Sequence, residues 1–168
     1  MPALYISHTN TESMTHQELM QLAIRLSEEN VLNGGGPFGA VIAKEGEVIA
    51  TGVNRVTANN DPTAHAEVSA IREACRKVKN FKLDGCVVYS SCEPCPMCLS
   101  ALYWAGISKI YYANTKDDAK AIDFDDSFIY EQLSLERGDR SIASEQMMHD
   151  EALKAFEMWR DKEDKTEY

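Results

Sequence analysis

The stretch CVVYSSCEPCPMCLSALYWA, residues 86–105, joins a predicted strand directly to a predicted helix and carries two cysteines at the junction. Residues 86–90 form a short apolar run typical of a strand, and the run from Cys95 to Ala105 predicts a core helix. Cys95 and Cys98 are three residues apart in the first helical turn, so they share one face. Unpaired backbone N–H groups and the helix dipole stabilise anions there, which favours the thiolate form that binds metals.

The elements around this stretch predict an α/β fold. Thr15 and Glu18 form a capping-box pattern ahead of apolar residues at helical spacing, which predicts a helix over 15–32. The order of strands and helices implies a three-layer α/β/α arrangement with a mixed central sheet flanked by helices. The remaining elements expected here are a strand hairpin over 38–44 and 47–53 that turns at Glu45-Gly46, a helix over about 63–79 with Asp61 as N-cap and Pro62 at its first position, and a strand over 109–113.

The last third of the chain has a weaker pattern. It supports a short helix over about 127–133 and a longer one over about 149–160. In the longer helix Leu153, Phe156 and Trp159 form an apolar stripe that must pack against some surface. We expect a single domain over 1–168, with a flexible arm over 1–14 and a C-terminal helix and tail over about 149–168.

The composition favours a small-molecule partner over a nucleic acid or a membrane. Lys and Arg number 17 against 27 Asp and Glu, for a net charge of −10, so the average field repels polyanions. No stretch approaches the roughly 20 apolar residues of a membrane span, and the first residues lack the features of an export signal. We therefore expect a cytoplasmic protein, in which five cysteines favour metal binding or packing over disulfides.

Three residues match the ligand set of a catalytic zinc site. Zinc takes Cys and His ligands in tetrahedral geometry, and a catalytic site keeps three protein ligands with water at the fourth position. His65, near the start of the helix expected over 63–79, would join Cys95 and Cys98. Cys92 is the alternative fourth ligand, which would make the site purely structural.

Glu67 favours the catalytic interpretation. A carboxylate two residues from a metal ligand can move protons at a metal-bound water, whose pKa zinc lowers towards about 7. Positions 65 and 67 of a regular helix lie on nearly opposite sides. We therefore expect the metal beyond the end of the helix, where the side chains of His65 and Glu67 can both reach it.

The two motifs together resemble the signature of the cytidine and nucleobase deaminases, which is H-x-E followed by P-C-x-x-C. The resemblance covers nearly the whole chain and is strongest to the bacterial guanine deaminases, a branch marked by residues 124–130 and by the terminal Glu167-Tyr168. Asp123 departs from the pattern, since a small residue is expected there. The other stretches that carry the resemblance are 36–41, 59–67 and 91–98.

The resemblance implies a zinc-dependent hydrolase with one Zn²⁺ per subunit that converts guanine to xanthine and ammonia. Glu67 would be the catalytic acid and base, and His65, Cys95 and Cys98 would hold the metal. In the family, an asparagine hydrogen-bonds the base, an aromatic residue packs on its flat face, backbone N–H groups hold the attacked ring, and an aspartate and a terminal tyrosine contact the amine edge. The substrate-binding residues implied in this sequence are Phe38, Asn54, Ala66, Glu93, Trp104, Asp126 and Tyr168.

The resemblance also implies a homodimer in which the C-terminal segment crosses to the partner subunit and closes its site. From periodicity alone, the helix over 149–160 is expected only to pack somewhere.

Three other functions remain open at this point. A tRNA adenosine deaminase shares the zinc motif but must bind a polyanion, which the acidic composition disfavours. A deaminase of another small amino-heterocycle, such as cytosine, guanosine or ammeline, is compatible with the same motif. The last alternative is a zinc scaffold without activity, in which Cys92 completes the tetrahedron.

Overall fold

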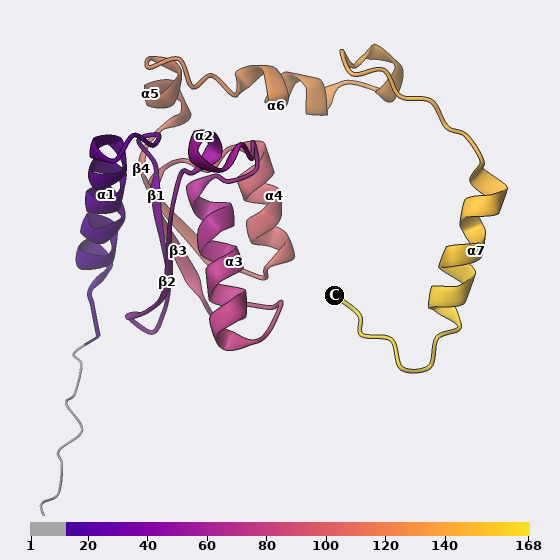
Figure 1. The fold of residues 1–168 in the computed structure, drawn as a ribbon, viewed down its shortest axis with the longest axis horizontal. Helices are drawn as coiled ribbons and strands as arrows, with labels where there is room; N and C mark the ends of the chain where they lie inside the picture. The colour runs from indigo at the N-terminus through magenta and orange to yellow at the C-terminus, as the bar shows by residue number, and fades with distance from the viewer. Residues whose placement is uncertain (1–12) are drawn as a thin grey trace, which may run out of the picture. The chain divides into compact units, whose positions relative to one another are not determined.

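The computed structural model describes residues 13–168, which divide into a first unit ending at Thr115 and a second unit over Lys116–Tyr168. The first unit is a four-stranded mixed sheet with helices on both faces (Figure 1). Residues 1–12 of the predicted arm lie outside the described residues. Ser13 and Met14, the last two residues assigned to that arm, lie against the first hairpin turn, where Met14 N donates to Gly46 O at 2.9 Å.

Helix α1 spans His16–Leu32 and covers one face of the sheet. The predicted capping box is confirmed, because Thr15 Oγ1 accepts from Glu18 N while the Glu18 carboxylate accepts from Thr15 N. The helix packs through Leu19 and Ala23 against the sheet. At its start, His16 Nδ1 lies 2.6 Å from the hydroxyl of Tyr89.

The sheet has the strand order β2-β1-β3-β4. Strands β1 and β2 form the antiparallel hairpin predicted around Glu45-Gly46, β1 also pairs antiparallel with β3, and β3 pairs parallel with β4. The strands span Gly39–Lys44 for β1, Glu47–Val53 for β2, Val87–Cys92 for β3 and Lys109–Asn114 for β4. The mixed pairing and the helices on both faces confirm the three-layer α/β/α fold.

Helix α3 begins later than predicted. It spans Ala66–Val78, and its N-cap is His65 rather than Asp61. The carboxylate of Asp61 instead accepts from both the backbone N and the hydroxyl of Thr63, at 2.8 and 2.7 Å. This local turn competes with the helix for the same backbone groups, so residues 61–65 form a loop that delivers His65 to the helix tip.

Helices α3 and α4 cover the other face of the sheet, where the larger core cluster lies. Helix α4 spans Pro96–Trp104 and follows β3 almost directly, as predicted. Gly52 permits the close approach of α3 to β2, because a side-chain carbon added there would lie 2.2 Å from the Ala66 carbonyl oxygen. The absence of a side chain at Gly52 therefore places the N-terminal end of α3 against the sheet.

Two short helices in or next to the first unit were not predicted. Helix α2 covers Val56–Asn59, and α5 covers Lys116–Lys120 at the start of the second unit. After α5, Asp123 has a positive φ of 70°. This left-handed conformation favours a residue without a bulky side chain, which gives a physical reason for the small residue expected at that position.

Besides α5, the second unit contains the two predicted helices and a 3-10 turn. Helix α6 spans Ser127–Ser134, a 3-10 turn covers Arg137–Asp139, and α7 spans His149–Arg160. The structure describes every residue of this unit, and none of the residues in α5, α6 or α7 is buried. No helix formed by residues 13–168 is both long enough and apolar enough to cross a membrane.

Candidate metal centre and catalytic site

Two helix ends meet at the predicted metal site. His65 is the N-cap of α3 and Cys95 is the N-cap of α4, and both have extended backbone conformations, with φ of −69° and −65°. Cys98 lies in the first turn of α4 and is fully buried. Because an N-cap side chain projects beyond the helix, His65 and Cys95 can face the same point in space.

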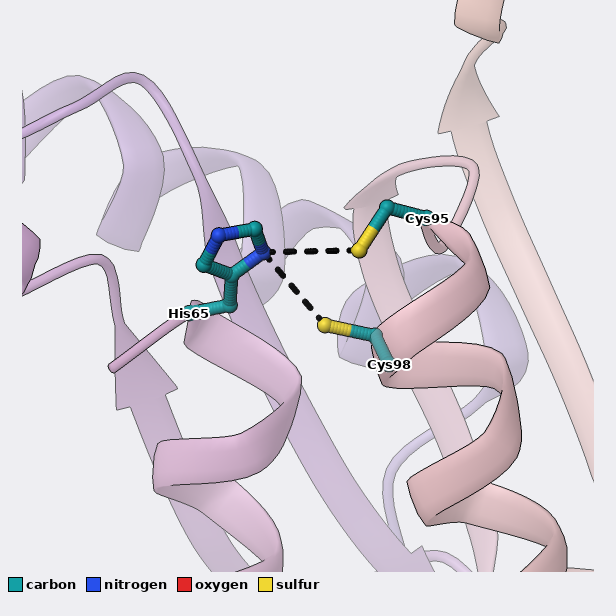
Figure 2. A group of neighbouring side chains, drawn as sticks. All are labelled: His65, Cys95 and Cys98. Carbon is teal, nitrogen blue, oxygen red and sulfur yellow. Dashed lines mark hydrogen bonds between the residues drawn. The ribbon is translucent and has the colours of Figure 1, made fainter. Parts of the chain in front are cut away.

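The three side chains converge as the sequence predicted (Figure 2). The Sγ atoms of Cys95 and Cys98 each lie 3.5 Å from His65 Nδ1. All three potential ligand atoms lie within 4.8 Å of one another. Nδ1 is therefore the imidazole nitrogen that faces the two sulfurs.

This arrangement fits a tetrahedral zinc ion. With bonds of about 2.3 Å to sulfur and about 2.0 Å to nitrogen, tetrahedral zinc separates those two ligand atoms by about 3.5 Å. The separations found here match that edge of the tetrahedron. Among residues 13–168 the ligand group contains His65, Cys95 and Cys98 and no fourth member. Three protein ligands leave one corner for water or substrate, as in catalytic zinc sites.

Cys92 does not join the ligand group. Its Sγ contacts the carbonyl oxygen of Thr115 at 3.6 Å, at the end of β3. The zinc scaffold that requires Cys92 as a fourth ligand therefore finds no support in the geometry. Cys75 and Cys86 pack in or against the core cluster instead.

The pKa values of the three ligand side chains depend on one another. A hydrogen bond from Cys98, reinforced by the His65 ring, lowers the pKa of Cys95 to about 4. The same contact raises the pKa of Cys98, and the contact with Cys95 raises the pKa of His65. A metal ion that binds here would displace the protons still held by these ligand atoms.

Glu67 is a buried carboxyl group beside the ligands. It lies in the first turn of α3 with 6% of its surface exposed, and burial raises its pKa. Oε1 of Glu67 accepts a hydrogen bond of 2.9 Å from Ser90 Oγ, and the carboxylate also interacts with the Cys98 thiol. A carboxyl group with raised pKa, next to a metal-ligand set, is suited to proton transfer.

Three of the expected substrate-binding residues lie on segments next to this centre in the fold. Phe38 immediately precedes β1 and is partly buried against the core. Asn54 follows β2, is 8% exposed, and accepts from Val56 N through Oδ1 at 3.3 Å. Ala66 is buried and opens α3.

Two other expected residues have a different setting. The backbone N–H of Glu93 donates to Asn114 O at 2.8 Å, at the end of β3. The part expected of Glu93 in binding the base stays a prediction. Trp104 ends α4 with 66% of its surface exposed, and its carbonyl accepts from Lys82 Nζ.

Asp126 and Tyr168 belong to the second unit. Asp126 occupies the N-cap position of α6 but makes no side-chain cap hydrogen bond, and the neighbouring Asp125 Oδ1 accepts from Ser127 N. Tyr168 is the last residue and is 75% exposed.

The structure adds Ser90, a buried polar residue that sequence reasoning missed. Ser90 faces the same side of β3 as Val88, which packs in the core beneath α3 and α4. The available signal was that Ser90 lies two positions after the buried Val88 on one strand, because strand side chains alternate between faces. Its partner Glu67 is 23 residues away in sequence, so the contact itself required the tertiary structure.

Comparisons with known proteins agree with this geometry. Residues 13–114 match the family described as the cytidine and deoxycytidylate deaminase zinc-binding region. Guanine deaminase of Bacillus subtilis (strain 168) is 49% identical over 92% of this chain and 100% of its own length. Its crystal structure matches with a TM-score of 0.89, over 92% of this chain and 99% of that one. A tRNA-specific adenosine deaminase of Aquifex aeolicus is 41% identical over 60% of this chain and 66% of its own.

The family match covers the residues that include His65, Cys95 and Cys98, which identifies the metal as zinc. The relative at 49% identity, matched over its full length, identifies the reaction class as hydrolytic deamination. This chain belongs to the zinc-binding cytidine and deoxycytidylate deaminase family.

Proposed function

We propose that this chain deaminates guanine to xanthine and ammonia, as part of purine catabolism or salvage in the cytoplasm. The observation that carries the proposal is the buried carboxyl group of Glu67 in contact with Cys98, one of the three zinc ligands. A structural zinc site has no need of a buried acid beside its ligands. A hydrolytic site requires one to move protons.

The residues of the site divide the chemistry between them. A zinc ion held by His65, Cys95 and Cys98 would supply an activated water molecule at neutral pH. Glu67 takes a proton from the attacking water as the water oxygen forms a bond to the ring carbon, and delivers this proton to the adjacent ring nitrogen. Glu67 then carries the second proton of the water to the exocyclic amine. The bond from the ring carbon to the amine nitrogen breaks, ammonia leaves, and the oxygen remains on the ring as a carbonyl group.

Two sets of residues recognise the base, one in each unit of the chain. Asn54 presents its amide beside the site, held through Oδ1 by Val56 N, so that Nδ2 can donate to an acceptor of the purine. Phe38 supplies a flat apolar face for the ring. Asp126 and Tyr168 supply polar groups for the N1 and amine edge, where an unpaired buried donor would cost about 1–3 kcal/mol.

Guanine is preferred to an RNA substrate for two reasons. The guanine deaminase of B. subtilis matches 92% of this chain, whereas the tRNA deaminase of A. aeolicus matches 60%. The net charge of −10 also opposes binding of a folded polyanion.

The proposed assembly is a homodimer that exchanges its C-terminal segment. Helix α7 exposes large apolar side chains, including Phe156 at 76% and Met158 at 66%. Apolar helices of this kind need a covering surface. A second copy of the chain is the partner proposed.

A substrate panel tests the proposal. The zinc-loaded protein would be assayed for ammonia release from guanine, guanosine, cytosine, ammeline and an anticodon stem-loop. We expect guanine to be turned over and the stem-loop not. Turnover of the stem-loop alone would replace the guanine assignment by RNA editing.

A second measurement separates an enzyme from a zinc scaffold. Glu67→Gln removes the acid while keeping the shape, and we expect kcat to fall by about 10³-fold with the zinc content unchanged. Glu73→Gln on the same helix is the control, since Glu73 pairs with Arg76 at the surface. Equal turnover by the Glu67→Gln and unchanged proteins would contradict a catalytic role for Glu67.

A further inference from the structure

Asn30 is a buried amide in the last turns of α1, far in sequence from the metal motifs. Only 4% of its surface is exposed. Its Nδ2 donates two hydrogen bonds, to Gly36 O at 2.8 Å and to Asn54 O at 2.9 Å. Both hydrogens of the amide group are therefore used to join two separate segments of backbone.

The two segments are those that carry Phe38 and Asn54. Phe38 N donates to Gly36 O at 2.8 Å, and Asn54 N donates to Phe38 O at 3.2 Å. Gly36 O thus receives both the Asn30 amide and the Phe38 amide. One closed network of hydrogen bonds therefore joins Asn30 and Gly36 to Phe38 and Asn54, the two residues expected to contact the base.

The chain is shaped to admit this amide. A side-chain carbon added at Gly35 would lie 2.3 Å from Asn30 Nδ2, so only glycine leaves room for it. Gly35 N also donates to Asn30 O at 2.8 Å. The segment before Phe38 therefore contacts both the backbone and the side chain of Asn30.

We propose that Asn30 is a positioning residue for substrate binding, which acts by holding Phe38 and Asn54 in the arrangement that receives the base. The proposal rests on the proposed function, because the contacts of Phe38 and Asn54 with a base belong to it. The two hydrogen bonds of the Asn30 amide go to backbone carbonyl groups of Gly36 and Asn54, not to a zinc ligand. Its loss should weaken binding of the base and leave the zinc and the Glu67–Ser90 pair in place.

Steady-state kinetics test this division. In Asn30→Ala and Asn30→Asp, two buried carbonyl groups lose their donor, and we expect KM for the deaminated base to rise about tenfold. The value of kcat should stay within about twofold of the unchanged protein, and the zinc content should be the same. Ser27→Ala is the matched control, since Ser27 is also buried on α1 but its hydroxyl bonds only to Ile24 O of the same helix. An unchanged KM, or an equal rise in Ser27→Ala, would overturn the proposal.

Amide hydrogen exchange gives a readout that does not depend on activity. We expect faster exchange of the Phe38 and Asn54 amides in Asn30→Ala than in Ser27→Ala, with exchange in β3 unaltered. Exchange rates at Phe38 and Asn54 that match those of the unchanged protein would overturn the positioning role. Failure of the unchanged protein to deaminate guanine would instead contradict the proposed function, while exchange would still decide the role of Asn30.

Discussion

The hydroxyl of Ser90 donates a hydrogen bond of 2.9 Å to Oε1 of Glu67, and both side chains are almost wholly buried. Ser90 lies on β3 and Glu67 on α3, so the bond crosses from the sheet to the helix above it. One oxygen of the carboxyl group is thereby fixed. The carboxyl group also interacts with the thiol of Cys98, which places it beside the metal ligands.

Ser90→Ala is expected to lower kcat with little change in KM. Without the hydroxyl, the Glu67 carboxyl group can rotate away from the position needed for proton transfer. We expect a loss of about tenfold in kcat, which corresponds to one hydrogen bond to a charged group. The measurement is steady-state ammonia release at saturating and limiting guanine.

Two variants make the Ser90 result interpretable. Ser90→Thr keeps the hydroxyl and should restore most of kcat. Ser91→Ala removes the neighbouring serine, whose Oγ accepts from Gly39 N at 3.0 Å, and should leave kcat nearly unchanged. A Ser90→Ala protein with unaltered kcat would mean that Glu67 is held by its other contacts.

The local elements of the fold were predictable because their signals are local. The capping box at Thr15 and the turn at Glu45-Gly46 depend on residues within a few positions, and both were confirmed. The start of α3 was predicted wrongly because Asp61 satisfies Thr63 in a turn, which looks like an N-cap in sequence. Helices α2 and α5 are too short to show an apolar period.

The metal site was predictable for a different reason. His65, Cys95 and Cys98 have ligand chemistry that is unusual enough to stand out at two helix starts. Asn30 and Ser90 act through hydrogen bonds between distant segments, and their residue types are common in loops and strands. Only the tertiary structure distinguishes them from ordinary polar residues.

Removal of a ligand cysteine should release the zinc, whereas removal of Cys92 should not. Cys98→Ala takes away one of three protein ligands, and we expect less than one zinc per chain after dialysis against a mild chelator. Cys92→Ala should keep one zinc per chain, because Cys92 contacts Thr115 O rather than the metal group. Elemental analysis of both purified proteins gives the answer. Loss of zinc from Cys92→Ala would place Cys92 among the ligands.

Gly52→Val on β2 should disturb the site by displacing α3. The new side chain would meet Ala66 O and Ala70 N, both backbone atoms of α3, so the helix has to move off β2. We expect the free energy of unfolding to fall by about 3 kcal/mol. Zinc binding should weaken as well, since His65 and Glu67 move with the helix end.

Gly138→Ala is the control for that substitution. A side-chain carbon at Gly138 meets nothing within 4 Å, so stability should change by no more than about 0.5 kcal/mol. Chemical denaturation and zinc analysis of the two variants give the comparison. A Gly52→Val protein as stable as the Gly138→Ala protein would show that α3 does not depend on close contact with β2.

Removal of residues 160–168 should abolish deamination while the zinc stays bound. The three ligands and Glu67 all lie in the first unit and stay in the truncated chain, whereas the truncation removes Tyr168, which is proposed to contact the base.

If the C-terminal segment serves the partner subunit, two inactive proteins can complement each other. The truncated chain keeps Glu67 but lacks the tail, and the full-length Glu67→Gln chain has the tail but lacks the acid. A mixed dimer then contains one site with both, so co-expression should restore activity that neither protein has alone. Without exchange, each site stays deficient in one part and the mixture stays inactive, which would assign the tail to its own subunit.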